Sequence, residues 1–165
     1  MAENRRSPAG CPHSRPWGRP RSSPAMDLDA LEPSFDLVAP RGEELMELFY
    51  ARLFEAAPAV KPLFAGTDMK RQRQMLLSAL VLLRNSLRDL DAVTPTLRKL
   101  GARHVRYGAE PGHYLVVGAT LIGAMAEIAG DAWELRYTEA WNEAFGVVSA
   151  VMLEGAAEAE LPAAA

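Results

Sequence analysis

Residues 97–108 read LRKLGARHVRYG, and this stretch governs how the rest of the chain is interpreted. Leu97, Leu100 and His104 recur at i, i+3 and i+7, so the histidine shares the apolar face of a helix expected over 95–107. No second histidine or carboxylate lies at i+3 or i+4 on that face, so no zinc site built from two imidazoles is offered. Two interpretations of His104 follow: a structural histidine facing the core, or the single axial ligand of an iron that a porphyrin already holds.

Outside this stretch the sequence predicts helices only, because Val, Ile and Thr form no alternating runs and no Asn-Gly or Asp-Gly hairpin signal occurs. We expect an all-α fold of about seven helices of unequal length, unlike a four-helix bundle. The boundary signals are breaks at Pro40 and Pro58, starts at Thr67 or Asp68, at Pro95 and at Pro111, and a turn at Gly130-Asp131. The later helices then cover about 69–87, 95–107, 111–129 and 133–155. The helix over 69–87 is so rich in apolar residues that we expect it to be buried on most sides.

Composition bounds the class of protein. The chain has 165 residues, 49% of them hydrophobic and 24% charged, which is typical of one soluble domain with a real core. Cys11 is the single cysteine, which excludes an intrachain disulfide and thiolate metal clusters and favours a reducing compartment, the cytoplasm. The net charge of −3 gives no reason to expect nucleic acid as a partner. The longest apolar run, 114–129, is interrupted by glycines and by Glu127 and is shorter than the ~20 residues of a membrane-spanning helix, so we expect no membrane.

The first 25 residues differ from the rest. They hold five arginines against one acidic residue, a local charge of 5 − 1 = +4, and five of the twelve prolines. We expect a disordered basic arm over 1–25, because so few apolar residues cannot offset the entropy of ordering. No apolar segment follows the arginines, so a secretory signal is not indicated. A transit peptide, a start of translation at Met26 and an arm that binds acidic partners are alternatives. A domain over 26–156 and a frayed tail over 157–165 complete the expected organisation.

Three segments carry a resemblance to a known family. Residues 100–108, followed by Gly112-His113-Tyr114, resemble the proximal segment of bacterial single-domain globins. Residues 49–54 with Pro58 and 61–64 resemble the distal half, and Trp141 with Phe145-Gly146-Val147 resembles the last helix. The segments cover about 27–153 in the family's order. The chain is therefore similar to the relatives of Vitreoscilla haemoglobin and to the globin domain of flavohaemoglobins.

The resemblance implies a globin fold around a pocket for haem b. His104 matches the proximal ligand of the haem iron, and Phe64 matches a phenylalanine that stacks on the haem. Tyr50 matches a distal tyrosine, with an ordinary core tyrosine as the alternative. Gln72 matches a distal glutamine that faces bound ligand, the alternative being a solvated residue with Gln74 nearby. The resemblance also implies further pocket residues, with Arg103 and Arg106 either facing the haem propionates or solvated: Leu76, Leu100, Arg103, Arg106 and Tyr114.

The chain departs from its relatives on the proximal side. Tyr114 is kept, but Ala156 stands where the family has a glutamate that supports the proximal histidine, and Ala109 stands where a valine is usual. An anionic partner makes an imidazole a stronger donor, so its loss puts nitric oxide detoxification in doubt. We assign no role to His113, near a helix start, or to His13, in the arm.

Three functions follow from the resemblance. The first is reversible binding of oxygen and other diatomic gases, such as NO and CO, for storage, transport or scavenging, by a protein that is not an enzyme. The second is a nitric oxide dioxygenase fed by a separate reductase, since no Gly-rich dinucleotide fingerprint is present. The third is a haem-based gas sensor, which normally needs an output domain. With no distal histidine we expect a mainly five-coordinate ferrous state, in a monomer or a homodimer.

Overall fold

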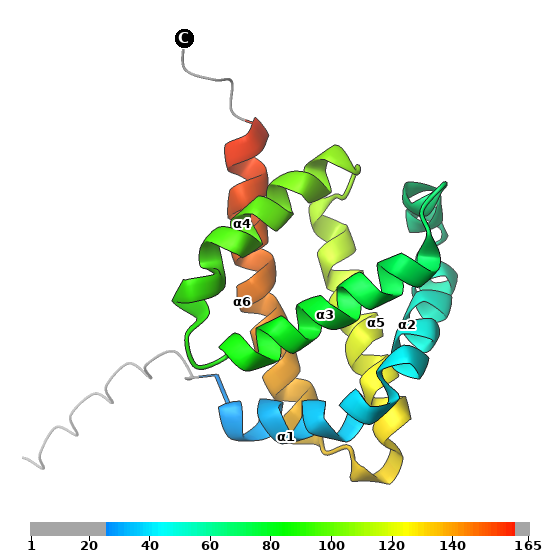
Figure 1. Cartoon of the computed structure of the whole chain (residues 1–165), viewed down its shortest axis with the longest axis vertical. Helices are drawn as coiled ribbons and strands as arrows, with labels where there is room; N and C mark the ends of the chain where they lie inside the picture. The colour runs from blue at the N-terminus through cyan, green and yellow to red at the C-terminus, as the bar shows by residue number, and fades with distance from the viewer. Residues whose placement is uncertain (1–25, 161–165) are drawn as a thin grey trace, which may run out of the picture.

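The computed structural model describes residues 26–160, which form six α-helices and three 3-10 helices and contain no strand (Figure 1). The α-helices are α1 (Leu28–Val38), α2 (Gly42–Ala56), α3 (Met69–Ser86), α4 (Leu90–Arg106), α5 (Pro111–Ala129) and α6 (Leu135–Glu160). The short helices are η1 (Ala39–Arg41), η2 (Pro58–Phe64) and η3 (Gly130–Ala132). The all-α prediction is confirmed, with six α-helices in place of about seven. The expected basic arm lies outside the described residues, and α6 extends through 157–160, which we expected to fray.

Aspartate side chains begin three of the helices. The Asp27 carboxylate accepts from the Ala30 amide at the start of α1, and the Asp68 carboxylate accepts from two amides at the start of α3. The Asp89 carboxylate accepts from the Ala92 amide at 3.3 Å and begins α4. The predicted start of this helix at Pro95 is therefore wrong. The Asp89 carboxylate binds the free amide of Ala92, so the helix begins at Leu90, before Pro95. Pro95 then lies within the first turns of the helix, where proline is tolerated.

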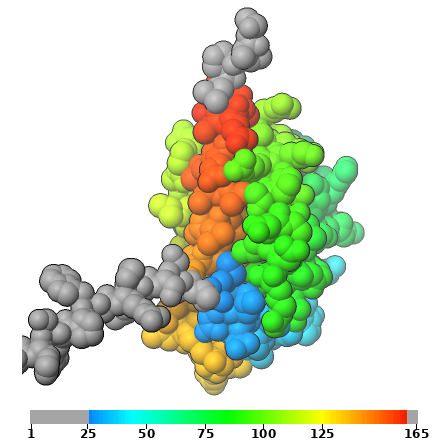
Figure 2. Space-filling model, turned by 90° about the vertical axis from the view of Figure 1, so that its left-hand side faces the viewer, coloured from blue at the N-terminus to red at the C-terminus, as the bar shows by residue number. Residues whose placement is uncertain are grey.

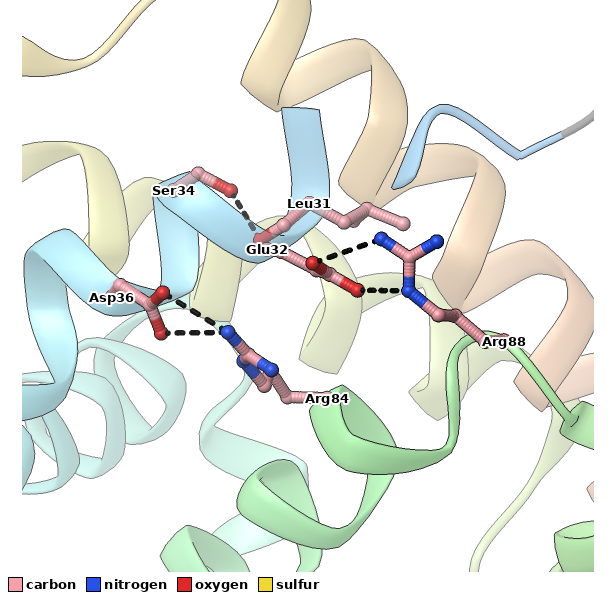
Figure 3. Close-up of polar contacts among 6 residues, drawn as sticks. All are labelled: Leu31, Glu32, Ser34, Asp36, Arg84 and Arg88. Atoms are coloured by element: carbon pink, nitrogen blue, oxygen red, sulfur yellow. Dashed lines mark hydrogen bonds and ion pairs between the residues drawn. The ribbon is translucent and has the colours of Figure 1, made fainter. Parts of the chain in front are cut away.

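Trp141 of α6 lies at the centre of the core with no exposed surface. Its ring packs against Phe35 and Phe145 with centroid distances of 6.3 and 5.7 Å. The indole N–H donates to the buried Ser34 hydroxyl at 2.9 Å, and that hydroxyl donates to the Leu31 carbonyl (Figure 3). The indole is thus satisfied inside an apolar environment, as buried polar groups must be.

The prediction that α3 is buried on most sides is wrong. Only Leu80 and Leu83 of this helix are buried, while Met75 and Leu82 are 57% and 50% exposed. α3 crosses in front of α5 (Figure 1), and the less exposed residues of α3 all lie on one side of the helix. Apolar residues outside that side therefore stay accessible, which composition alone does not reveal.

Two ion pairs join the end of α3 to α1. The Arg84 guanidinium binds the Asp36 carboxylate at 3.0 Å, and Arg88, just after α3, binds Glu32 at 2.9 Å (Figure 3). Each pair is at least partly exposed, so each contributes little stability by itself, typically about 0–1 kcal/mol. Together they orient the end of α3 relative to α1.

α5 is longer than the apolar run over 114–129 that we judged too short to span a membrane. With η3 it forms a 22-residue helical stretch, Pro111–Ala132, of mean hydropathy 1.5, which is long and apolar enough to cross a membrane by length and composition. A core helix passes the same test. α5 contacts α2 and α6, and its Leu121 and Met125 are buried in the core, as expected of such a core helix.

α4 and α6 cross with their backbones in contact. A Cβ added to Gly101 of α4 would overlap the Met152 carbonyl oxygen, and a Cβ added to Gly155 of α6 would overlap the Arg98 carbonyl oxygen. Figure 2 shows α6, orange to red, running beside the green residues on this face. Only glycine permits so close an approach. The crossing sets where α4, and with it His104, sits against the rest of the molecule.

Candidate functional site

Two polar side chains from different helices meet near η2. Tyr50 of α2 is 5% exposed, and the Gln72 side-chain amide of α3 donates to its hydroxyl oxygen at 3.1 Å. Burial raises the pKa of Tyr50, so the phenol stays protonated at neutral pH. Its oxygen accepts from Gln72, and no acceptor for its proton lies within residues 26–160. The hydroxyl proton and the second amide proton of Gln72 are thus free to donate to a third group.

The structure separates the two glutamines that the sequence left as alternatives. Gln72 is partly buried and reaches Tyr50, whereas Gln74 is exposed. Leu76 follows Gln72 by one turn, is partly buried and packs against the core. The Asp68 cap fixes where α3 begins, four residues before Gln72. The start of the helix in turn determines the helix face that carries Gln72 and Leu76.

Phe64 at the end of η2 closes this region on one side. Its ring meets Tyr50 edge-on at 5.7 Å and Phe54 at 5.5 Å. Such T-shaped pairs stabilise by about 0.5–1.5 kcal/mol beyond burial. The aromatic cluster therefore holds the Tyr50 ring in a low-dielectric environment, where a hydroxyl donor acts more strongly than in water.

His104 lies on the partly buried side of α4. Its Nδ1 lies 2.8 Å from the Leu100 carbonyl oxygen, and since a carbonyl can only accept, Nδ1 carries the proton and donates. Nε2 therefore presents a lone pair, and it has no hydrogen-bond partner in the described part of the chain. The rings of Tyr107 and Tyr114 flank the imidazole at 6.4 and 6.0 Å. The imidazole is thus oriented by its own backbone, and its Nε2 lone pair could bind a metal.

The other residues predicted on the side of His104 differ in how far they are buried. Leu100 and Tyr114 are partly buried, and burial raises the pKa of Tyr114. Arg103 and Arg106 are exposed, and neither has a carboxylate within 4 Å in the described range.

No carboxylate supports the imidazole from α6. Ala156 is buried, and Glu154 is paired with Arg98 at 2.7 Å. His104 Nδ1 thus has a neutral backbone acceptor where its relatives are expected to supply an anionic one. His113 has a structural part, because its Nδ1 accepts from the Glu110 amide at 3.0 Å where α5 begins. His13 lies outside the described residues.

Gly101 and Gly155 are the positions that sequence reasoning missed. A glycine inside a predicted helix costs about 1 kcal/mol relative to alanine, so its presence usually has a packing reason. Gly101 lies between Leu100 and His104 on the predicted helix, and this was the available signal. Its partner helix was not predictable in the same way, since the contact residue Met152 lies 152 − 101 = 51 positions away.

The chain is similar to known proteins over most of its length. The globin family model matches residues 47–152 of the chain. A flavohemoprotein of Bacillus cereus is 30% identical over 136 residues, which are 81% of this chain and 33% of that protein. A flavohemoprotein of Rhodopirellula baltica is 32% identical over 124 residues, covering 73% of this chain and 30% of that protein. The chain thus spans about a third of the length of these relatives.

Three solved structures match over nearly their whole length. An engineered carbene transferase, described as a putative nitric oxide dioxygenase from Rhodothermus marinus, aligns with a TM-score of 0.73 and 24% identity, covering 82% of this chain and 94% of that one. A bacterial globin from Campylobacter jejuni aligns with a TM-score of 0.70 and 22% identity, covering 79% and 94%. A Pseudomonas aeruginosa protein, described as structurally highly homologous to a human hemoglobin, aligns with a TM-score of 0.68 and 25% identity, covering 78% and 96%.

Proposed function

Because this chain belongs to the globin family, we propose that it binds one haem b through His104 and uses it to bind oxygen reversibly, for storage, transport or scavenging. The observation that carries the proposal is the buried pair of Tyr50 and Gln72, whose free protons have no acceptor within residues 26–160. The uncommitted Nε2 of His104 supports it as the ligand of the iron. We place this function in the cytoplasm, the reducing compartment expected for a chain with one cysteine.

The donor set suits a haem better than a bare metal ion. Within residues 26–160 no group of three or more His, Cys, Asp or Glu side chains could hold a metal ion. A porphyrin brings four nitrogens of its own, so a single imidazole is a sufficient protein ligand. When bound, the haem supplies a ferrous iron that takes up small diatomic gases. The side chains proposed to hold it are His104, Phe64, Leu76, Leu100, Arg103 and Tyr114.

Tyr50 and Gln72 are proposed to hold the gas ligand. A diatomic ligand that carries partial negative charge is stabilised by hydrogen-bond donors in a low-dielectric pocket. The Tyr50 hydroxyl stays protonated, since burial raises its pKa, and its oxygen already accepts from Gln72. Its O–H is therefore free to donate to a bound gas, and Leu76 is proposed as part of the apolar wall.

The proximal hydrogen bond supports a carrier over a redox enzyme. His104 donates to the neutral Leu100 carbonyl, and Glu154 of α6 is paired with Arg98. An imidazole without an anionic partner is a weaker electron donor to its metal. The proximal side thus lacks the negative charge that would strengthen electron donation from His104 to the iron, as nitric oxide detoxification is expected to need.

The proposal is tested by absorbance spectra of the purified protein with one equivalent of haem in its ferric, dithionite-reduced and CO-bound forms. We expect a Soret band that shifts between the three forms, with a mainly five-coordinate ferrous spectrum. The absence of a shift would overturn haem binding. A bis-histidine ferrous spectrum would contradict the open distal side.

Replacing the Tyr50 hydroxyl is expected to speed the loss of oxygen. In Tyr50→Phe the oxygen dissociation rate should rise by about tenfold or more, since a hydrogen bond to a charged acceptor is worth about 1.5–3 kcal/mol. CO dissociation should change much less, because bound CO carries less charge. Stopped-flow ligand exchange measures both rates. Tyr137→Phe, at a buried tyrosine of α6 whose hydroxyl donates to Glu134, is the matched control and should leave both rates unchanged.

A second candidate is a nitric oxide dioxygenase that receives electrons from a separate reductase. The similarity to the Rhodothermus marinus structure, described as a putative nitric oxide dioxygenase, favours it. The two candidates differ in nitric oxide consumption by the oxygenated protein when a flavin reductase and NADPH are supplied. Sustained turnover would favour the dioxygenase, and a single stoichiometric event the carrier.

A further inference from the structure

α5 has an exposed apolar face on the side away from the core. Gly112, Leu115, Ala119 and Gly123 are all exposed and recur every three or four residues, so they share one side of the helix. We call these four residues the α5 face. Leu115 is 77% exposed, the highest value among the large apolar residues that the structure describes. A contiguous apolar face of this kind marks a contact with another molecule.

No charged side chain interrupts the α5 face. Residues 111–126 contain no Lys, Arg, Asp or Glu, in a chain that is 24% charged. The whole chain carries −3 and residues 1–25 carry +4, so residues 26–165 carry −3 − 4 = −7. Two copies of so acidic a domain repel one another over most of their surface, but not at the α5 face. A membrane surface would instead be matched by Lys and Arg beside the apolar residues, and 111–126 offer none.

Two glycines of the α5 face have no packing partner within one copy. Gly118, on the buried side of α5, does have one, because a Cβ there would lie 3.7 Å from the Phe145 side chain. Nothing lies within 4 Å of a Cβ built on Gly112 or on Gly123. Glycine inside a helix is destabilising relative to alanine and usually has a packing reason. The space over Gly123 is therefore open to a side chain of another molecule.

The α5 face is symmetric about Ala119. Leu115 lies four residues before Ala119, and Gly123 lies four residues after it. A two-fold axis through Ala119 and perpendicular to α5 reverses the helix end to end, so positions equally far from Ala119 face each other in the two copies. Leu115 of each copy then lies over Gly123 of the other. The largest side chain of the face thus meets open space, which is the self-complementarity that a two-fold interface requires.

The two ends of α5 are complementary in charge. Pro111 and Glu127 lie eight residues before and after Ala119, so the same axis brings Glu127 near the first turn of the second copy's α5. The N-terminus of a helix is the positive end of its dipole and favours a nearby carboxylate. Glu127 is half exposed and also binds Arg52 of α2, which places this ion pair at the polar edge of the contact.

We propose that a second copy of this chain covers the α5 face, in a two-fold dimer whose α5 helices pack antiparallel through Leu115, Ala119 and Gly123. The small residues allow the two helix backbones to approach closely, and the two leucines fill the space over the two glycines. The inference goes beyond the proposed haem function and does not depend on it. Because the contact centres on one helix from each copy, we expect a weak dimer that forms as protein concentration rises.

A disulfide across the two-fold axis tests the arrangement directly. In the full chain with Cys11→Ser, the substitution Ala119→Cys places one thiol of each copy at the axis, within reach of the other. Mild oxidation with copper phenanthroline should join most chains into covalent dimers. The matched control is Ala132→Cys, at an exposed alanine of η3 outside the α5 face, which should stay largely monomeric. Absence of a cross-link at Ala119, or equal cross-linking at both positions, would overturn the inference.

Sedimentation equilibrium measures the dimer without a covalent link. As concentration rises, the mass of the wild type should increase from one chain of 18.0 kDa toward two. Leu115→Glu should weaken the dimer by about tenfold or more, since the buried leucine of each copy is replaced by a charge. Leu135→Glu makes the same change at a leucine that is 74% exposed and should have no effect. A wild type that stays monomeric at every concentration, or equal losses in both variants, would contradict the proposed dimer.

Exchanging the large and the small residue tests their pairing. Gly123→Leu fills the space that Leu115 of the other copy would occupy and should abolish the dimer, while leaving the fold intact because nothing lies near that Cβ. Adding Leu115→Ala to Gly123→Leu should restore the dimer, since each new leucine then faces an alanine. Circular dichroism verifies that each variant is folded. A dimer that persists in Gly123→Leu, or one that the double variant fails to restore, would refute this packing.

Lipid is the other occupant that these experiments distinguish. The wild type is mixed with phosphatidylglycerol vesicles and sedimented. We expect the protein to remain in solution, because its apolar residues are covered by the second copy. Vesicle binding by a protein that forms no dimer would assign the α5 face to a membrane and overturn the inference.

Discussion

His104→Ala is expected to abolish stoichiometric haem binding. The imidazole is oriented by the 2.8 Å hydrogen bond to the Leu100 carbonyl, and its uncommitted Nε2 is the nitrogen that we assign to the iron. Loss of an outer-sphere partner alone commonly weakens metal binding 10–100-fold, so loss of the ligand itself should weaken haem binding by more than about 100-fold. Titration of the apoprotein with haem, followed at the Soret band, measures the change.

Two controls separate ligation from folding in this experiment. His113→Ala removes the acceptor of the Glu110 amide at the start of α5 and should cost stability of about 1 kcal/mol, but should still bind one haem per chain. His104→Gly leaves space for a free imidazole, and added imidazole should restore the ferric spectrum. A His104→Ala protein that still gives the wild-type Soret shift with one equivalent of haem would refute the assignment of His104.

Gly101→Ala is expected to destabilise the protein by more than about 3 kcal/mol. The added Cβ would overlap the carbonyl oxygen of Met152, which is helix backbone and cannot rotate away. α4 must therefore move off α6, and the buried contacts along the crossing are lost, as in other overpacked cores. Gly155→Ala should act similarly from the opposite helix, since its Cβ would overlap the Arg98 carbonyl oxygen. Urea denaturation followed by circular dichroism gives the free energy of unfolding.

Gly146 provides the matched control on the same helix as Gly155. Nothing lies within 4 Å of a Cβ built on Gly146, so Gly146→Ala should be neutral or stabilise by up to about 1 kcal/mol through helix propensity. If Gly101→Ala proved as stable as Gly146→Ala, the α4–α6 backbone contact would be wrong. Because α4 carries His104, we also expect the Gly101 variant to bind haem more weakly than wild type.

Most helix boundaries were predictable from local signals. The Asp68 cap, the proline that begins α5 and the glycine turn at Gly130 each act through residues no more than four positions away. The start of α4 was misplaced for the same kind of reason. Two local signals competed, and the Asp89 cap prevailed over Pro95. The burial of α3 could not be predicted from its own sequence. Met75, Leu82 and Leu80 are all large apolar residues, but only Leu80 is buried, because only Leu80 faces a neighbouring helix.

The sequence by itself determined that this protein is all-helical and that His104 lies on the apolar side of its helix, because periodicity and capping are interactions within one or two turns. Only the tertiary structure decided that Gln72, and not Gln74, meets Tyr50, which is 22 residues away in the chain. The tertiary structure also decided that α4 rests on α6 through Gly101 and Gly155. These contacts depend on how whole helices cross, and many helix arrangements are compatible with the same local patterns. One arrangement is selected by the close packing of the core and by the few positions where the backbones can touch.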